Sequence, residues 1–214
     1  ALANKHPHIE WHETIHALPD DVPWLVVANE FFDALPIRQF VGDIERKIDV
    51  SANRLTWSPA AAEVTKETCE VAEALMNTIA THIAKKGGAA LIADYGYENG
   101  SSGDTLQAVK NHKYYDVLKD AGDADLTAHV DFSALINIAK GAGATTYGPI
   151  PQGRFLGKLG AIPRAVRLCE GIPQEQQATI MSGLRRLLAP DEMGELFKVM
   201  CVLPKKHTLP EGFE

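Results

Sequence analysis

The chain has no run of about 20 consecutive apolar residues, the length that an α-helix needs to cross a bilayer, and its start does not resemble a signal peptide. Cysteine is scarce: Cys69, Cys169 and Cys201 are far apart, odd in number, and form no Cys-x-x-Cys pair. This usage is typical of a reducing compartment and argues against a zinc site. We therefore expect a soluble protein without membrane insertion and without a metal centre.

Several motifs of known chemistry are absent too. The sequence contains no Gly-x-Gly-x-x-Gly fingerprint, no Walker loop and no Gly-x-Ser-x-Gly elbow. Lys and Arg number 21 against 28 Asp and Glu, a net charge of −7, and no concentrated basic face is apparent. We expect no nucleic-acid binding, and a basic protein or a small cation suits the charge better. The early histidines (His6, His8, His12 and His16) match no metal-ligand spacing.

Hydrophobic patterning over these 214 residues predicts an α/β domain with an elaboration. The predicted elements are strands at 9–13, 24–29, 89–93, 145–147 and 196–203, a β-meander at 38–57, helices at 66–86 and 131–140, and a mainly helical region at 152–186 broken at Pro163 and Pro173. A glycine-rich loop is expected at 98–103. Because a helix separates the two strongest apolar strands, we expect these strands to be parallel neighbours.

Both of these strands are followed at once by acidic residues. Asn29, Glu30 and Asp33 come after the first strand, and Asp94 comes after the second. Charged groups are rarely buried without partners, so this pattern indicates a cleft at one edge of the sheet. Simpler interpretations remain open: Asp33 can cap the loop before Pro36, Asp131 can cap a helix, and His129 can be a buried structural histidine.

Several short motifs then point to a family. They are Asn-Glu-Phe-Phe-Asp-Ala-Leu-Pro at 29–36, Asp-Tyr-Gly-Tyr at 94–97, Gly-Asp-Thr-Leu at 103–106, Leu-Thr-Ala-His-Val-Asp-Phe at 126–132, Gln-Gly-x-Phe-Leu at 152–156 and Glu-Met-Gly-Glu-Leu-Phe-Lys-Val at 192–199. In this order, over nearly the whole chain, they resemble the MidA-type family. That family includes a mitochondrial complex I assembly factor that methylates a protein arginine.

The resemblance implies a class I methyltransferase on a Rossmann-like sheet, using S-adenosylmethionine, in the bacterial cytoplasm or the mitochondrial matrix. It divides the chain into a partial core at 1–150 with a hairpin insertion near 37–57, a helical elaboration at 151–190, and a final core strand and tail at 191–214. The resemblance also implies that a full-length member begins with a glycine-rich loop after its first strand and an acidic residue after its second, whereas this chain is expected to start near the third strand. We expect that an N-terminal portion is missing, so that an apolar sheet edge favours low stability or a homo-oligomer.

The resemblance also implies roles for single residues. Asn29 would position the acceptor nitrogen or the methyl donor, while Glu30 and Asp33 would act as catalytic residues that clamp a cationic arginine. The expected substrate-binding residues are Asp94, Tyr95, His129 and Asp131. The expected cofactor-binding residues are His12, Glu13, Asn29 and Phe31.

Two other functions remain open. The first is a non-enzymatic assembly module whose acidic edge holds a basic partner, which predicts binding without cofactor dependence. The second is a different nucleotide enzyme, such as a dehydrogenase, which requires a dinucleotide fingerprint that this sequence does not contain.

Overall fold

The computed structural model describes residues 5–60, 63–98, 103–111 and 113–214. Its main sheet has the order β1-β6-β12-β11, with β10 added beside β6. The strands of this sheet are β1 (Trp24–Asn29), β6 (Gly88–Tyr97), β10 (Val130–Asp131), β11 (Thr145–Pro151) and β12 (Phe197–Leu203). β1 is parallel to β6, as predicted, whereas β12 is antiparallel to both β6 and β11.

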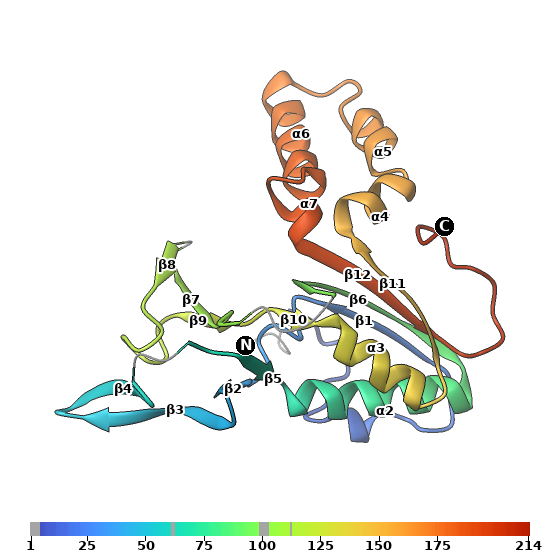
Figure 1. Cartoon of the computed structure of the whole chain (residues 1–214). Helices are drawn as coiled ribbons and strands as arrows, with labels where there is room; N and C mark the ends of the chain where they lie inside the picture. Colours follow the sequence, from blue (N-terminus) through green and yellow to red (C-terminus); the bar gives the residue numbers. More distant parts are fainter. Residues whose placement is uncertain (1–4, 61–62, 99–102, 112) are drawn as a thin grey trace.

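Helices α2 (Glu70–Lys86) and α3 (Phe132–Gly141) lie along one face of this sheet (Figure 1). Their apolar sides and that face form a single core, in which several side chains are completely excluded from water. The fully buried members include Met76, Ile83, Ile92, Phe132 and Met200. Burying side chains of this size supplies the main free energy that holds the sheet and helices together.

The opposite face of β1 is uncovered in this chain. Leu25 and Val27 point away from α2 and α3, and they are 85% and 78% exposed. Alternate residues of a strand point to opposite faces, so the same strand buries Ala28 in the core. The self-association expected from the sequence stays a prediction.

Two small antiparallel sheets lie outside the main one. The first has the order β4-β3-β2-β5 and the second the order β8-β7-β9. Their strands are β2 (Arg38–Val41), β3 (Ile44–Ser51), β4 (Arg54–Ser58), β5 (Lys66–Thr68), β7 (Gln107–Lys110), β8 (Lys113–Tyr115) and β9 (Asp125–Thr127). Strands β2 to β4 occupy the segment predicted as a meander, and they project beside the core (Figure 1).

Three sequence predictions about local structure are wrong. Residues 66–68 form strand β5 instead of the first turn of α2, because they pair with β2 across the small sheet. Residues 9–13 form no strand, and only a 3₁₀ turn (η1, Ile15–Ala17) precedes β1. Pro163 does not break the helical region, since it lies in the first turn of a helix, where its missing N–H is not needed. The predicted loop at 98–103 lies mostly outside the described residues.

The helical region extends away from one end of the main sheet (Figure 1). Its helices are α4 (Gln152–Lys158), α5 (Ala161–Leu168), α6 (Gln174–Leu188) and α7 (Met193–Leu196). Gly160, in the left-handed conformation, separates α4 from α5, and Pro173 precedes α6 as its N-cap. These helices bury little: α6 has no buried residue and α5 has only Ala165.

Candidate active site

Glu30, directly after β1, lies beside the part of β6 that carries Asp94. Asn29, the last residue of β1, pairs with Ala93 of β6, and the Glu30 N–H donates to the Ala93 carbonyl at 3.0 Å. Strand β6 continues past this point to Tyr97, so Asp94 lies within a strand and not at its end. Glu30 and the residue before Asp94 are therefore neighbours, as expected, but Asp94 is buried and Glu30 is exposed, so a shared cleft for the two carboxylates stays a prediction.

Glu30 turns the chain sharply after β1. Its φ of 46° lies in the left-handed region, which is uncommon for a residue with a side chain. Local strain of this kind is often found at functional sites. After this turn, the N–H groups of Phe31, Phe32 and Asp33 all donate to one oxygen, Oδ2 of Asp94, at 3.1, 2.9 and 3.3 Å. The Glu30 side chain itself is exposed.

Asp94 is completely buried. Burial raises the pKa of its carboxyl to about 7, the nearby Asp33 carboxylate adds to the rise, and the three N–H donors oppose it. Asp94 therefore holds the loop of residues 30–33 through its hydrogen bonds. It has no exposed surface with which to contact a substrate. This is a correction, because the sequence suggested direct contact between Asp94 and the substrate.

Asp33 is only 6% exposed, and its Oδ1 has no hydrogen-bond partner among the described residues. The Tyr95 phenol is nearby: its pKa is raised chiefly by burial and further by Asp33. The Thr127 hydroxyl is also buried, and no hydrogen-bond partner for it is found in the described part of the chain. Unpaired buried oxygens are costly, so Asp33 offers an acceptor for a donor that enters from outside.

A cavity of about 460 Å³ opens beside β1, and we call it the β1 cavity. It is lined by residues of the segment before β1, by β1 itself and by α2. All four residues predicted to bind the cofactor are among its lining residues: His12, Glu13, Asn29 and Phe31.

A second cavity, of about 220 Å³, lies between the N-terminal ends of α2 and α3, and we call it the α2–α3 cavity. His129 and Asp131 line it together with Glu67 and Tyr97. Phe32 lines both cavities, so one buried ring separates them. The predicted substrate-binding residues are thus divided: two line this cavity, whereas Asp94 and Tyr95 are buried.

Two side chains that line the α2–α3 cavity, His129 and Tyr97, have shifted pKa values. Burial lowers the pKa of His129, with Glu67 acting in the opposite direction. Burial raises the pKa of Tyr97 to about 12, and Asp131 and Glu67 add to the rise. The lowered pKa favours the neutral form of His129, whose ring packs edge to face on Tyr95 with 5.4 Å between the ring centres. Asp131 caps α3 by accepting the Ala134 N–H at 3.0 Å, so the simpler interpretation of this residue also holds.

Some residues of this region were not found from the sequence. Glu67 is 92% buried, but it lies in the stretch predicted as the start of a helix. Thr105 is bonded to both Glu67 and the His129 N–H, yet a single threonine carries no recognisable pattern. Tyr97 belongs to the Asp-Tyr-Gly-Tyr motif, which was a usable signal.

Comparison with known proteins identifies the family. A model described as "Putative S-adenosyl-L-methionine-dependent methyltransferase" matches residues 1–54 and 42–150. The chain belongs to this family. It is similar to the mitochondrial protein arginine methyltransferase NDUFAF7 of Mus musculus (35% identity, 93% of this chain and 50% of the relative) and of Homo sapiens (34%, 93% and 49%). The chain spans about half the length of these relatives.

Two solved structures from Burkholderia thailandensis share the methyltransferase fold. One, of an uncharacterised protein, has a TM-score of 0.75 and 27% identity, covering 94% of this chain and 58% of that one. The other belongs to the same superfamily and is described as a "likely methyl transferase" bound to S-adenosyl-homocysteine; it has a TM-score of 0.75 and 25% identity, covering 100% of this chain and 60% of that one. The Rossmann-like class I fold predicted from the sequence is confirmed.

The residues of the β1 cavity suit the donor that this family uses. The lining combines an aromatic ring (Phe31), apolar side chains from β1 and α2, and a few polar groups, including Glu13 and Asn29. Cofactor sites commonly have this composition. Within the described residues, no group of three His, Cys, Asp or Glu side chains is arranged to hold a metal ion, and no helix is long and apolar enough to cross a membrane.

Proposed function

We propose that this protein transfers a methyl group from S-adenosylmethionine to an arginine side chain of a protein substrate. Its family and the names of its mitochondrial relatives support this function. The observation that carries it is the buried Asp33 carboxylate, three residues after the strained Glu30, with one oxygen that is unpaired among the residues the structure describes. The link to respiratory complex I assembly stays a prediction from the resemblance.

An arginine acceptor poses a chemical difficulty. Its guanidinium is protonated at any working pH and its lone pairs are delocalised. Carboxylates on either side of the planar group localise its charge, orient it, and accept a proton as the nitrogen attacks. Glu30 and Asp33 supply these two carboxylates, one exposed and one buried.

The remaining residues position the reactants. Asn29, exposed at the end of β1, orients the acceptor nitrogen or the donor's amino-acid portion. His12, Glu13 and Phe31 hold the donor in the β1 cavity. When bound, S-adenosylmethionine supplies an electrophilic methyl group. The transfer is an in-line displacement, so alignment and exclusion of water account for most of the catalysis.

Tyr95, His129 and Asp131 form the far wall of the acceptor site in this proposal. Burial lowers the pKa of His129 and so favours its neutral form, which does not repel a cationic substrate. Asp94 acts behind this wall, since it holds the N–H groups of Phe31 to Asp33. The Asp33 carboxylate therefore keeps its position through Asp94.

The test measures donor binding and turnover separately in the complete natural protein. S-adenosyl-homocysteine is titrated by calorimetry, and methyl transfer to an arginine peptide is followed by mass spectrometry. Glu30→Gln and Asp33→Asn are each expected to lower kcat by about 100-fold or more, without change in the affinity for S-adenosyl-homocysteine. Glu175→Gln, on the exposed surface of α6, is the matched control.

The alternative functions make different predictions in the same experiment. A non-enzymatic module binds a basic partner equally well with and without S-adenosyl-homocysteine. Unchanged turnover in both Glu30→Gln and Asp33→Asn removes the carboxylate clamp from the mechanism. Failure of the wild-type protein to bind S-adenosyl-homocysteine contradicts the proposed function itself.

A further inference from the structure

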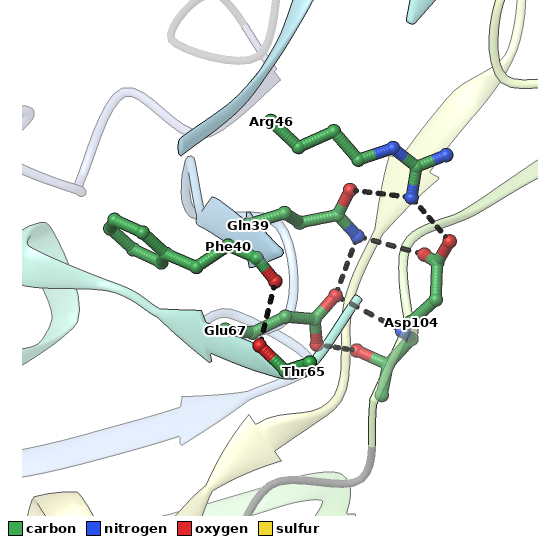
Figure 2. Close-up of polar contacts among 7 residues, drawn as sticks. Gln39, Phe40, Arg46, Thr65, Glu67 and Asp104 are labelled. Carbon is green, nitrogen blue, oxygen red and sulfur yellow. Dashed lines mark hydrogen bonds and ion pairs between the residues drawn. The ribbon is translucent and has the colours of Figure 1, made fainter. Parts of the chain in front are cut away.

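A buried carboxylate on β5, in the wall of the α2–α3 cavity, is the centre of a hydrogen-bond network that extends away from this cavity. Figure 2 shows Glu67 facing Gln39 of β2 and the segment that carries Asp104. Its Oε1 accepts the Gln39 side-chain amide at 2.7 Å and the Thr105 N–H at 3.0 Å, and its Oε2 accepts the Thr105 hydroxyl at 2.5 Å. We call these residues, with Arg46, the Glu67 network.

The network joins segments that are far apart in the sequence. The Gln39 amide also donates to Asp104 at 2.8 Å, and Arg46 donates to Asp104 at 2.6 Å and to Gln39 at 3.3 Å (Figure 2). The Arg46 guanidinium stacks 3.9 Å from the ring centre of Trp57 on β4. Hydrogen bonds thus connect strands β2, β3 and β5 of one small sheet to the segment that leads into β7.

This network reaches the candidate active site through one hydroxyl. Thr105 Oγ1 donates its single proton to Glu67 and accepts the His129 N–H at 3.0 Å. The neighbouring N–H, that of Ala128, donates to the Asp33 carbonyl at 2.9 Å. Two consecutive N–H groups therefore connect the network on one side to the Asp33 loop on the other.

The energetic cost of burying the Glu67 carboxylate indicates that this network fixes the positions of backbone segments. A buried carboxylate costs desolvation free energy, and its hydrogen bonds offset that cost only when all partners are in place. Removing one partner leaves the others unpaired, so the arrangement is nearly all-or-none. Such a network holds backbone segments in one position more strictly than apolar contacts of similar size can.

We infer that Glu67 and Thr105 are positioning residues: they fix the Ala128–His129 segment and, through it, the loop that carries Asp33. The inference rests on the proposed methyl transfer. It makes the small sheet β4-β3-β2-β5 a working part of the site, although none of its strands contacts Glu30 or Asp33 through a hydrogen bond among the described residues. Misplacing a reacting group by about 1 Å can cost on the order of 100-fold in rate.

The test compares Thr105→Val, which keeps the shape and removes the hydroxyl, with Thr105→Ser, which keeps the hydroxyl. Thr105→Val is expected to lower kcat about 10- to 100-fold, with unchanged affinity for S-adenosyl-homocysteine. Thr105→Ser is expected to keep most of the wild-type kcat. Thr179→Val is the matched control, because the Thr179 hydroxyl donates to the Glu175 carbonyl within the exposed helix α6. Glu67→Gln keeps the size of the side chain and replaces Thr105→Val if that variant does not fold.

A second readout does not depend on activity. In Thr105→Val, amide hydrogen exchange at both Ala128 and His129 is expected to accelerate about 10-fold or more, while exchange in α2 stays unchanged. Exchange that accelerates at His129 but not at Ala128 overturns the inference, and so does a kcat equal to that of Thr179→Val. A wild-type protein without any methyl transfer counts against the proposed function, and the exchange data then decide this inference alone.

Discussion

The main sheet and the small sheet β4-β3-β2-β5 are stabilised in different ways. In the main sheet, Ile92 and Met200 pack with Met76 and Phe132 of the helices, and all four are completely buried. In the small sheet, apolar side chains such as Ile48 stay exposed, and the buried groups include the polar Gln39 and Glu67. Apolar burial therefore holds the first, whereas directional hydrogen bonds hold the second.

This difference matters because the candidate active site lies where the two regions meet. The Asp33 loop belongs to the main sheet through Asp94, and its neighbour His129 is tied to the small sheet through Thr105. Apolar packing is insensitive to direction and tolerates small shifts, whereas a hydrogen bond weakens steeply with angle. The core supplies stability, and the network supplies precise position.

The largest expected effect is on the core. Phe132→Ala removes a completely buried ring, so the free energy of unfolding should fall by about 3–5 kcal/mol. Chemical denaturation followed by circular dichroism measures the change. Ile48→Ala, at a position 49% exposed, is the control and should change stability by less than about 0.5 kcal/mol. Equal losses in the two variants contradict the proposed difference between the sheets.

The next effect depends on pH and comes from Asp94. Its pKa in the folded protein, about 7, is above that of an unfolded aspartate, so the folded state keeps a proton that the unfolded state has released. Stability should therefore fall as the pH rises from about 4 to about 7, by roughly 4 kcal/mol, and then level off. Asp94→Asn should abolish this slope. Urea titrations at several pH values measure the free energy of unfolding of both proteins. If its dependence on pH is unchanged in Asp94→Asn, groups other than Asp94 cause that dependence.

A smaller effect is expected in the small sheet. Trp57→Ala removes the ring on which Arg46 stacks, at a cost of about 1 kcal/mol. Amide exchange should accelerate in β3 and β4 and near Asp104, while β6 and β12 keep their protection. Acceleration throughout the main sheet would mean that the two regions unfold as one unit.

The smallest effect is expected in the helical region. Arg185 pairs with Asp191 and Glu192 at 2.6 Å each, but all three side chains are exposed. Exposed ion pairs contribute little because water and salt screen them. Arg185→Ala should leave the melting temperature unchanged within error at high salt. A clear drop in scanning calorimetry would show that this region depends on charge more than the main sheet does.

The sequence predicted the local elements well where the pattern is strong. Strand β1 and the parallel pairing of β1 with β6 follow from two apolar runs separated by a helix. The short strand β5 was missed because three residues carry no periodicity, and it exists only through its pairing with Arg38 to Phe40. Residue type alone does not show which side of α2 is buried, because Val71 is 47% exposed whereas Ala72 and Met76 are buried.

The candidate site was predicted in part. The motif at 29–36 pointed to Glu30 and Asp33, and the structure brings Glu30 beside β6 as expected. The role of Asp94 was not predictable, because three of its four N–H donors come from residues 61 to 63 positions earlier. Glu67 and Thr105 were missed for the same reason: their partners are distant in the sequence.

The sequence by itself determined the apolar strands, the core helices and the acidic residues that follow β1, since these depend on the periodicity of neighbouring residues. Only the tertiary structure decided that Asp94 turns inward, that Phe32 separates two cavities, and that Glu67 reaches His129 through Thr105. The physical reason is range: hydrophobic periodicity is a local property, whereas a hydrogen bond requires two groups within about 3 Å, wherever they lie along the chain.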